Sequence, residues 1–139
     1  VIWAAEYEGP KRCRMCHKDV HAQWANSPHA MAYEDPIFQE VWKSVGSEFS
    51  CLVCHATGAD MDTETFAFSG VTCESCHGPG SMYKGASVMK NKELAMQKGL
   101  IEPTEEVCKM CHNEESPTYV PFDYAARVAE ISHDDPTTE

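Results

Sequence analysis

The sequence predicts a small, mostly α-helical domain with extensive coil, and three observations support this fold class. Its 139 residues are about one domain's worth of chain. Valine, isoleucine and leucine are scarce, while Gly and Pro each occur eight times, so the chain offers a thin aliphatic core and many breaks between elements. Four short motifs of two cysteines and a histidine recur along it. These motifs indicate that bound groups fill the middle of the domain.

Helix start and stop signals place the elements in order along the chain. The expected helices are 13–27, 37–45 with Asp35 as N-cap and Gly46 as stop, 88–98 with Ser87 as N-cap and Gly99 as stop, 105–112 after Thr104, and 124–132 after Asp123. Pro28 opens a further turn through 29–33, and Gly-Pro-Gly at 78–80 forces a sharp turn. One short strand is expected at 65–68. No linker divides the chain, so residues 1–139 are predicted to form one domain with a flexible tail at 134–139.

The eight cysteines form four pairs with the same spacing, and a histidine follows each pair directly. The cysteines are Cys13, Cys16, Cys51, Cys54, Cys73, Cys76, Cys108 and Cys111, and the histidines are His17, His55, His77 and His112. CxxCH is the attachment signature of c-type haem, because two thiols must reach the two vinyl groups on one porphyrin edge while the adjacent imidazole binds the iron. The sequence therefore predicts four covalent haem c groups with the chain wrapped around them, at about 35 residues per haem.

Two other uses of the eight cysteines are weaker. Two Cys₄ zinc sites would use four CxxC pairs, but zinc gives no reason for the histidine after each pair. Disulfides within CxxC are strained and usually redox-active, which does not suit a structural scaffold. Haem accounts for both the cysteines and the histidines.

Charge and hydropathy limit the partners and the location. The formal net charge is −11, which disfavours nucleic acid and suits a redox-partner protein with a basic docking patch. No apolar run approaches the roughly 18 residues of a transmembrane segment. Covalent haem attachment takes place outside the cytoplasmic membrane, so we expect a periplasmic, extracellular or surface-held protein. The first ten residues lack a signal-peptide pattern, which we interpret as a mature chain with its signal removed.

Three histidines remain for the second axial positions of the irons, namely His21, His29 and His133. Four irons have eight axial positions and the chain has seven histidines, so one position is open or takes another ligand. His29 lies about 18 Å beyond His17 along a continuous helix, so it should bind a different haem. His133 can reach back to an early haem. His21 is either a ligand of a neighbouring haem or a polar cover over propionates.

Three segments resemble the cytochrome c-554 family of multihaem cytochromes. "CRMCHKDVHAQWANSPHAMA" is similar to its first-haem segment, "GVTCESCHGPG" to its third, and "PTYVPFDYAARVAEISH" to its C-terminal helix with a ligand histidine. The resemblance implies stacked haem pairs with propionates toward solvent. It also implies that His29 is the distal ligand of the third haem and His133 that of the first, with the second haem five-coordinate.

The sequence departs from the family at the fourth haem. The family takes a histidine about ten residues after the third motif, where this chain has Ser87. Methionine is the next natural ligand, and Met82, Met89 and Met96 lie in this segment. Met89 is closest to the expected position, although methionines at helical spacing usually pack in a core. The alternatives are His21, an open site or a group from a partner. His21 is also a candidate for the second haem.

An electron-transfer protein of an exported respiratory chain, rather than an enzyme, is the function that these features favour. No acid, base or nucleophile constellation independent of haem is visible. One alternative is a haem enzyme that binds nitric oxide, nitrite, hydroxylamine or peroxide at a five-coordinate iron. Another is a self-associating subunit of an extracellular cytochrome filament, with a neighbouring subunit supplying the missing ligand.

Overall fold

The computed structural model describes residues 5–133, and within them short helices and coil dominate. The helices are α1 (Pro10–Arg14), α2 (Lys18–Ala25), α3 (Pro36–Ser44), the 3₁₀ turn η1 (Phe49–Cys51), α4 (Leu52–His55), α5 (Cys73–His77), α6 (Ala86–Met89), α7 (Lys92–Gln97), α8 (Glu105–Lys109) and α9 (Tyr124–Ile131). The only strands in this part of the chain are β1 (Ala56–Thr57) and β2 (Phe68–Ser69). The predicted fold class, mostly α with extensive coil, is confirmed. The expected flexible tail at 134–139 lies outside the described residues.

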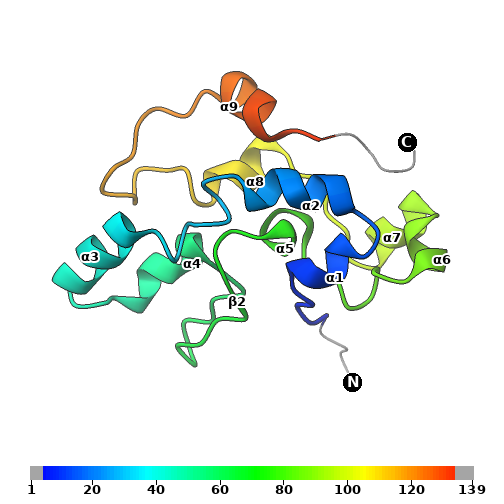
Figure 1. The fold of residues 1–139 in the computed structure, drawn as a ribbon, viewed down its shortest axis with the longest axis horizontal. Helices are drawn as coiled ribbons and strands as arrows, with labels where there is room; N and C mark the ends of the chain where they lie inside the picture. The colour runs from blue at the N-terminus through cyan, green and yellow to red at the C-terminus, as the bar shows by residue number, and fades with distance from the viewer. Residues whose placement is uncertain (1–4, 134–139) are drawn as a thin grey trace.

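The helices are spread along one long axis (Figure 1). Helices α3 and α4 lie at one end of this axis, and α1, α6 and α7 lie at the other. Helices α8 and α5 lie between the two ends, and α9 lies above them in this view. No helix of the described residues is long and apolar enough to cross a membrane.

Two aspartates begin helices as the sequence predicts. The Asp35 carboxylate accepts hydrogen bonds from the backbone N–H of Ile37 at 2.8 Å and of Phe38 at 3.1 Å, and Pro36 occupies the first turn of α3. The Asp123 carboxylate accepts one from the N–H of Ala126 at 3.2 Å at the start of α9. Both caps satisfy N–H groups that the first turn of a helix leaves without partners.

Two predicted helices are each divided in the structure. The helix expected at 13–27 is α1 and α2, and the chain leaves helical geometry at His17, where φ is −118° and ψ is 55°. The helix expected at 88–98 is α6 and α7, because the Asn91 side chain accepts a bond from the N–H of Leu94 and begins a new helix. Ser87 does not cap it, since α6 already begins at Ala86. In both places a local end signal interrupts a pattern that reads as continuous.

The β-hairpin differs by a few residues from the predicted strand. Strands β1 and β2 are antiparallel, with Ala56 opposite Ser69 and Thr57 opposite Phe68. The strand expected at 65–68 therefore overlaps β2 only at Phe68, and an isolated bridge joins Asp60 to Thr65. The hairpin leads directly into α5.

Glycines permit close backbone approaches around α5. Gly70 has φ +81°, and a Cβ built there would lie 2.6 Å from the carbonyl oxygen of Ala30. Gly78, which follows α5, has φ +84°, and a Cβ there would lie 2.7 Å from the carbonyl oxygen of Gly99. Only glycine fits both the left-handed backbone and the space. The sharp turn expected at 78–80 instead lies at 81–83, where the N–H groups of Tyr83 and Lys84 donate to the carbonyl of Gly80, while the Ile101 N–H donates to the His77 carbonyl and holds the end of α5 against the stretch after α7.

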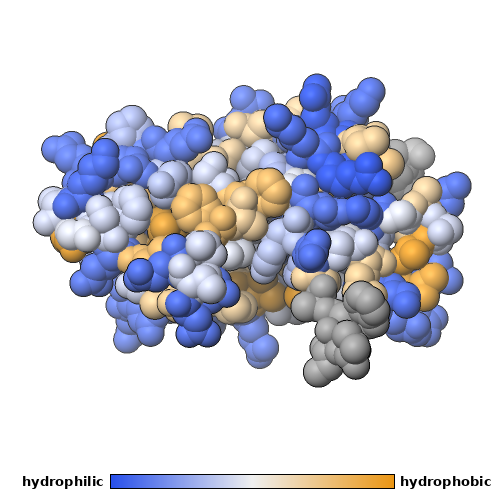
Figure 2. All heavy atoms as spheres, turned by 90° about the horizontal axis from the view of Figure 1, so that it is seen from below, coloured by the Kyte–Doolittle hydropathy of each residue, from blue (hydrophilic) through white to orange (hydrophobic). Residues whose placement is uncertain are grey.

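The protein core is small. Among the described residues the buried apolar side chains are Leu52, Ala56, Tyr83 and Ala95. Many larger apolar side chains remain exposed, including Ile37 at 74%, Met110 at 72% and Met15 at 65%. Figure 2 shows apolar side chains gathered in the middle of one face, with polar side chains around them. Exposure of this extent marks surfaces that receive a ligand or partner.

Candidate haem-attachment sites

Each CxxCH motif lies on a helical turn that sets its thiols side by side. In the first motif the N–H of His17 donates to the carbonyl of Cys13 at 2.9 Å, and in the fourth the N–H of His112 donates to that of Cys108 at 3.0 Å. Residues three apart on such a turn share a face, so both thiols of a motif can reach one porphyrin edge. All eight cysteines are free. Within residues 5–133, no three His, Cys, Asp or Glu side chains are grouped to hold a metal ion by themselves.

Backbone carbonyls orient two of the motif imidazoles. Nδ1 of His55 lies 2.7 Å from the carbonyl oxygen of Ala32, and Nδ1 of His77 lies 2.9 Å from that of Ile101. A proton on Nδ1 satisfies each contact and leaves Nε2 as the free lone pair. This second contact is how proteins fix the tautomer and ring orientation of a metal-binding histidine.

Aromatic rings stack on the faces of two motif imidazoles. Phe38 of α3 stacks on His55 with ring centroids 3.8 Å apart and planes 7° apart. Phe122 stacks on His112 with centroids 4.8 Å apart and planes 28° apart. The edge of each imidazole remains available to a ligand, because the aromatic ring covers a face.

Two pairs of imidazoles have the spacing of axial ligands on one iron. The ring centroids of His29 and His112 are 6.2 Å apart, and those of His77 and His133 are 6.0 Å apart. Imidazole nitrogen binds a metal at about 2.0–2.1 Å, and the centroid lies roughly 1 Å behind it, so two axial imidazoles have centroids about 6 Å apart. The residues present therefore fit a haem iron between the members of each pair.

Burial keeps three of these imidazoles, those of His29, His77 and His112, in the form that binds metal. Burial lowers the pKa of His29, and the charges of His112 and Arg127 lower it further. Burial is also the main cause that lowers the pKa of His77 and of His112. The neutral imidazole is the ligand form, so this environment favours iron binding over protonation.

These pairs differ from the pairing that the family resemblance implies. That pairing joined His29 to the third motif and His133 to the first, whereas the rings in contact are His29 with His112 and His133 with His77. The carbonyl of His29 does accept the N–H of Val71 at 2.9 Å, so its backbone runs beside the entry to the third motif while its ring meets the fourth. Gln23 of α2 donates to the carbonyl of Ser132 at 3.2 Å and so holds the backbone beside His133.

The four motifs lie in a row, and cysteines of neighbouring motifs shift each other's pKa values. The neighbouring Cys73 thiol raises the pKa of Cys13, and Cys13 in turn lowers that of Cys73. Likewise, the neighbouring Cys54 thiol raises the pKa of Cys111, and Cys111 lowers that of Cys54. Burial and then the neighbouring Cys108 raise the pKa of Cys76. Along the long axis of Figure 1, α1, α5, α8 and α4 follow in this order, so the motifs that they carry lie in the order first, third, fourth and second.

His21 lies on α2 and packs on a neighbouring side chain. Its ring meets that of Trp24 edge-on, with centroids 5.4 Å apart and planes 61° apart. The indole N–H of Trp24 donates to the carbonyl of Val71 at 2.7 Å, which fixes this pair near the entry to the third motif. These contacts place His21 near the entry to the third motif, and its role as an iron ligand stays a prediction.

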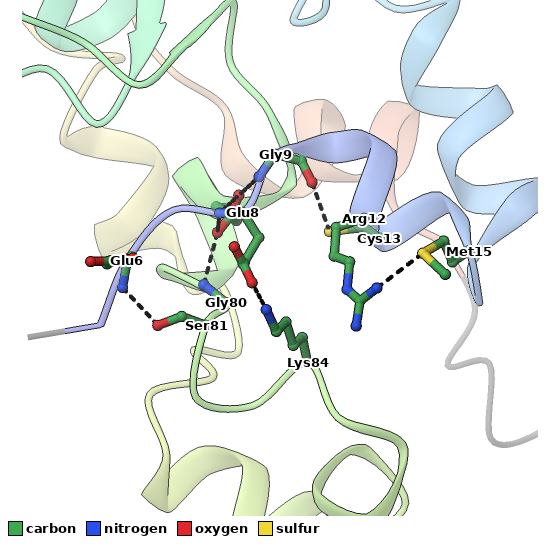
Figure 3. Close-up of polar contacts among 10 residues, drawn as sticks. Glu6, Glu8, Gly9, Arg12, Cys13, Met15, Gly80, Ser81 and Lys84 are labelled. Atoms are coloured by element: carbon green, nitrogen blue, oxygen red, sulfur yellow. Dashed lines mark hydrogen bonds and ion pairs between the residues drawn. The ribbon is translucent and has the colours of Figure 1, made fainter.

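Met89 is the half-buried last residue of α6. The segment before α6 is bound to residues that precede α1. Ser81 donates its N–H to the Glu6 carbonyl at 3.1 Å and accepts the Glu6 N–H at 2.7 Å, and Lys84 forms an ion pair with Glu8 (Figure 3). These contacts bring the stretch before α6 beside the chain that leads into α1, and ligation by Met89 stays a prediction.

Sequence reasoning missed several residues that shape the sites. Phe38 stacks on His55, Thr57 is a buried hydroxyl that bonds to the segment around the third motif, and Glu74 is a buried carboxylate inside that motif. An acidic residue between the two cysteines of a motif was the one visible signal for Glu74. Aromatic stacking and hydroxyl networks across the chain leave no local pattern.

Four attachment motifs, oriented imidazoles and paired axial positions in a small helical fold define a multihaem c-type cytochrome. The family model "Cytochrome c554 and c-prime" matches residues 12–78. Cytochrome c-554 of Nitrosomonas europaea is 29% identical over 142 residues, an alignment that covers 78% of this chain and 58% of that protein. The chain thus spans 58% of the length of this curated relative. The solved structure of reduced cytochrome c554 from Nitrosomonas europaea matches with a TM-score of 0.59 and 28% identity, over 92% of this chain and 79% of that one. The chain is therefore similar to cytochrome c-554 in sequence and in fold, and it binds haem c covalently.

Proposed function

We propose that this protein is an electron carrier whose residues 1–139 form one unit around four haems. The order of α1, α5, α8 and α4 along one axis, which sets the first, third, fourth and second motifs in a row, is the observation that supports it most. Thioether bonds at the cysteines of these motifs would bring successive haem edges close together. When bound, each haem iron takes up and releases one electron between its ferric and ferrous states.

The eight cysteines would hold the four haems, and the four motif histidines would bind the irons from one side. His29 and His133 would supply the opposite ligands at the fourth and third motifs, as the centroid distances of 6.2 and 6.0 Å support. Each such pair links distant parts of the chain. Axial binding would therefore fasten α9 and the turn after α2 to the middle of the molecule.

Met89 is our proposed second ligand at the first motif. The contacts of Ser81 with Glu6 and of Lys84 with Glu8 support this choice, because they tie the segment before α6 to that motif. His21 lies one helical turn after His17, on the same side of any haem held there, so it cannot close the opposite face. A thioether ligand favours ferrous iron. It would therefore raise the reduction potential of the haem at the first motif above that of the same haem with two imidazole ligands.

The physiological partners would be redox proteins that meet the two ends of the row. A formal charge of −11, made more negative by haem propionates, suits partners with basic docking patches. Covalent haem attachment supports a location in the periplasm or at the cell surface, within a respiratory chain.

A potentiometric titration of the haem-loaded protein, followed optically, tests this function. We expect an intact mass with four haem additions, four reversible one-electron steps, and rapid electron exchange with a small basic redox protein that slows as salt is added. A protein that carries four haems but does not exchange electrons within seconds would contradict the proposal.

A second candidate function is the binding of a small nitrogen or oxygen species at the second motif. His29, His133 and Met89 are assigned to other motifs and His21 packs on Trp24, so the proposed ligand set leaves no side chain for the second iron. Addition of nitric oxide to the reduced protein should then change the spectrum of one haem in four. No spectral change would exclude this activity.

A further inference from the structure

Glu74 is a deeply buried carboxylate inside the third CxxCH motif. Its side chain is only 2% exposed, and it lies on α5 directly after Cys73. Its oxygens accept the backbone N–H of Glu8 at 2.8 Å, of Gly9 at 2.6 Å and of Gly80 at 2.8 Å. Figure 3 shows the backbone of Glu8, Gly9 and Gly80, which supplies these donors. Because both oxygens only accept, the contacts match the ionised carboxylate.

The carboxylate links the third motif to the first. Glu8 and Gly9 directly precede α1, which carries Cys13, and the Cys13 thiol donates to the Gly9 carbonyl at 3.8 Å. The Cys73 hydrogen bond and burial are the larger causes that raise the pKa of Cys13, and the charge of Glu74 raises it further. The carboxylate of Glu74 therefore lies near attachment residues of both motifs, because Cys73 precedes it in the chain and Cys13 bonds to Gly9, which also bonds to Glu74.

The third motif differs in charge from the other three. The residue after the first cysteine is Arg14 in the first motif, Leu52 in the second and Lys109 in the fourth, but Glu74 in the third. A buried charge is screened much less by water than a surface charge, so its effect on nearby groups is large. Reduction of a haem removes one positive charge, and a fixed negative charge nearby opposes that step.

We propose that Glu74 lowers the reduction potentials of the haems at the third and first motifs and so helps to set the direction of electron flow. One electron from the reductant converts ferric to ferrous iron, and no bond or proton changes at Glu74 in this step. Glu74 is a tuning residue that acts through its charge. The inference depends on haem attachment at these motifs and, for its consequence in electron flow, on the proposed carrier function.

The test is a spectroelectrochemical titration of the full, haem-loaded protein and its variants. Glu74→Gln removes the charge at nearly constant shape, Glu74→Met removes it without adding a competing N–H, and Glu74→Asp keeps it on a shorter side chain. Glu106→Gln is the matched control, because Glu106 is exposed and lies two residues before Cys108. Melting curves and low-spin spectra of all variants report on structure separately.

We expect the neutral variants to raise the ferrous-to-ferric ratio of at least one haem about tenfold at fixed potential, which is about 59 mV for one electron. Glu74→Asp should keep the wild-type potentials even if its melting temperature falls, and Glu106→Gln should change neither. Unchanged potentials in the neutral variants, or the same shift in Glu74→Asp, would overturn the inference. If neither Glu74→Gln nor Glu74→Met takes up four haems, Glu74 is needed for haem attachment, and the inference that it tunes potentials is overturned as well. Absence of reversible one-electron steps in the wild type would instead refute the carrier function.

Discussion

The imidazoles of His29 and His112 face each other with centroids 6.2 Å apart, although His29 follows the first motif and His112 ends the fourth. This distance is that of two axial ligands on one iron, since each nitrogen would lie about 2 Å from the metal. The pair joins the turn after α2 to the end of α8. If both rings bind one iron, as we propose, ligand binding also fastens these distant segments together.

His29→Ala should convert one haem in four from low-spin to high-spin in the oxidised protein, because the fourth iron loses its second imidazole. EPR and optical spectra measure the change, and added imidazole should reverse it. His21→Ala is the control and should leave all spectra unchanged, since His21 packs on Trp24. A low-spin His29→Ala protein would show that His29 is not a ligand.

Met89→Ala should abolish the far-red sulfur-to-iron absorption band of the oxidised protein and open the first iron. Met89→His should restore a low-spin haem with a lower potential, because imidazole favours ferric iron more than a thioether does. We expect at least a tenfold change in its ferrous-to-ferric ratio, or about 59 mV. Met96, which is 46% exposed, provides the control variant Met96→Ala. Persistence of the band in Met89→Ala would assign Met89 to packing alone.

Gly70→Ala should lower the free energy of unfolding by about 1–3 kcal/mol, because φ is positive there and the new Cβ meets the Ala30 carbonyl oxygen at 2.6 Å. Thermal or denaturant unfolding of the haem-loaded protein measures the loss. Gly85→Ala should have little effect, since no atom lies within 4 Å of a Cβ built at Gly85. Equal stability of the two variants would contradict the close approach of the strand to the His29 turn.

Thr57→Val should destabilise the protein by about 1–3 kcal/mol, because it removes the centre of a buried hydroxyl network. The Thr57 hydroxyl donates to the Gly70 carbonyl at 2.8 Å and lies 2.9 Å from the hydroxyls of both Thr72 and Ser75. Thr63→Val at the exposed end of the hairpin is the control. If the two valine variants unfold at the same denaturant concentration, the network contributes nothing measurable.

Local chemistry explains what the sequence could predict. Asp35 and Asp123 cap helices through atoms two or three residues away, so their role is visible in a short stretch. The CxxCH motifs likewise contain both attachment thiols and one iron ligand. Pattern alone did not reveal the breaks at His17 and Asn91, because the residues on either side of each favour helix.

Contacts between distant segments explain what the sequence could not predict. His29 follows the first motif and its backbone bonds to Val71, yet its ring meets His112. Glu74 reads as a charged surface residue, but the amides of Glu8, Gly9 and Gly80 bury it. Both outcomes depend on which segments meet in three dimensions, and no residue spacing records that.

The most direct test of the central claim is the EPR spectrum of the fully oxidised, haem-loaded protein. The proposed ligand set predicts two low-spin haems with paired imidazoles, from His29 with His112 and from His77 with His133. It predicts one further low-spin haem with a sulfur ligand and one high-spin haem at the second motif. A spectrum in which fewer than two haems have paired imidazoles would contradict this account.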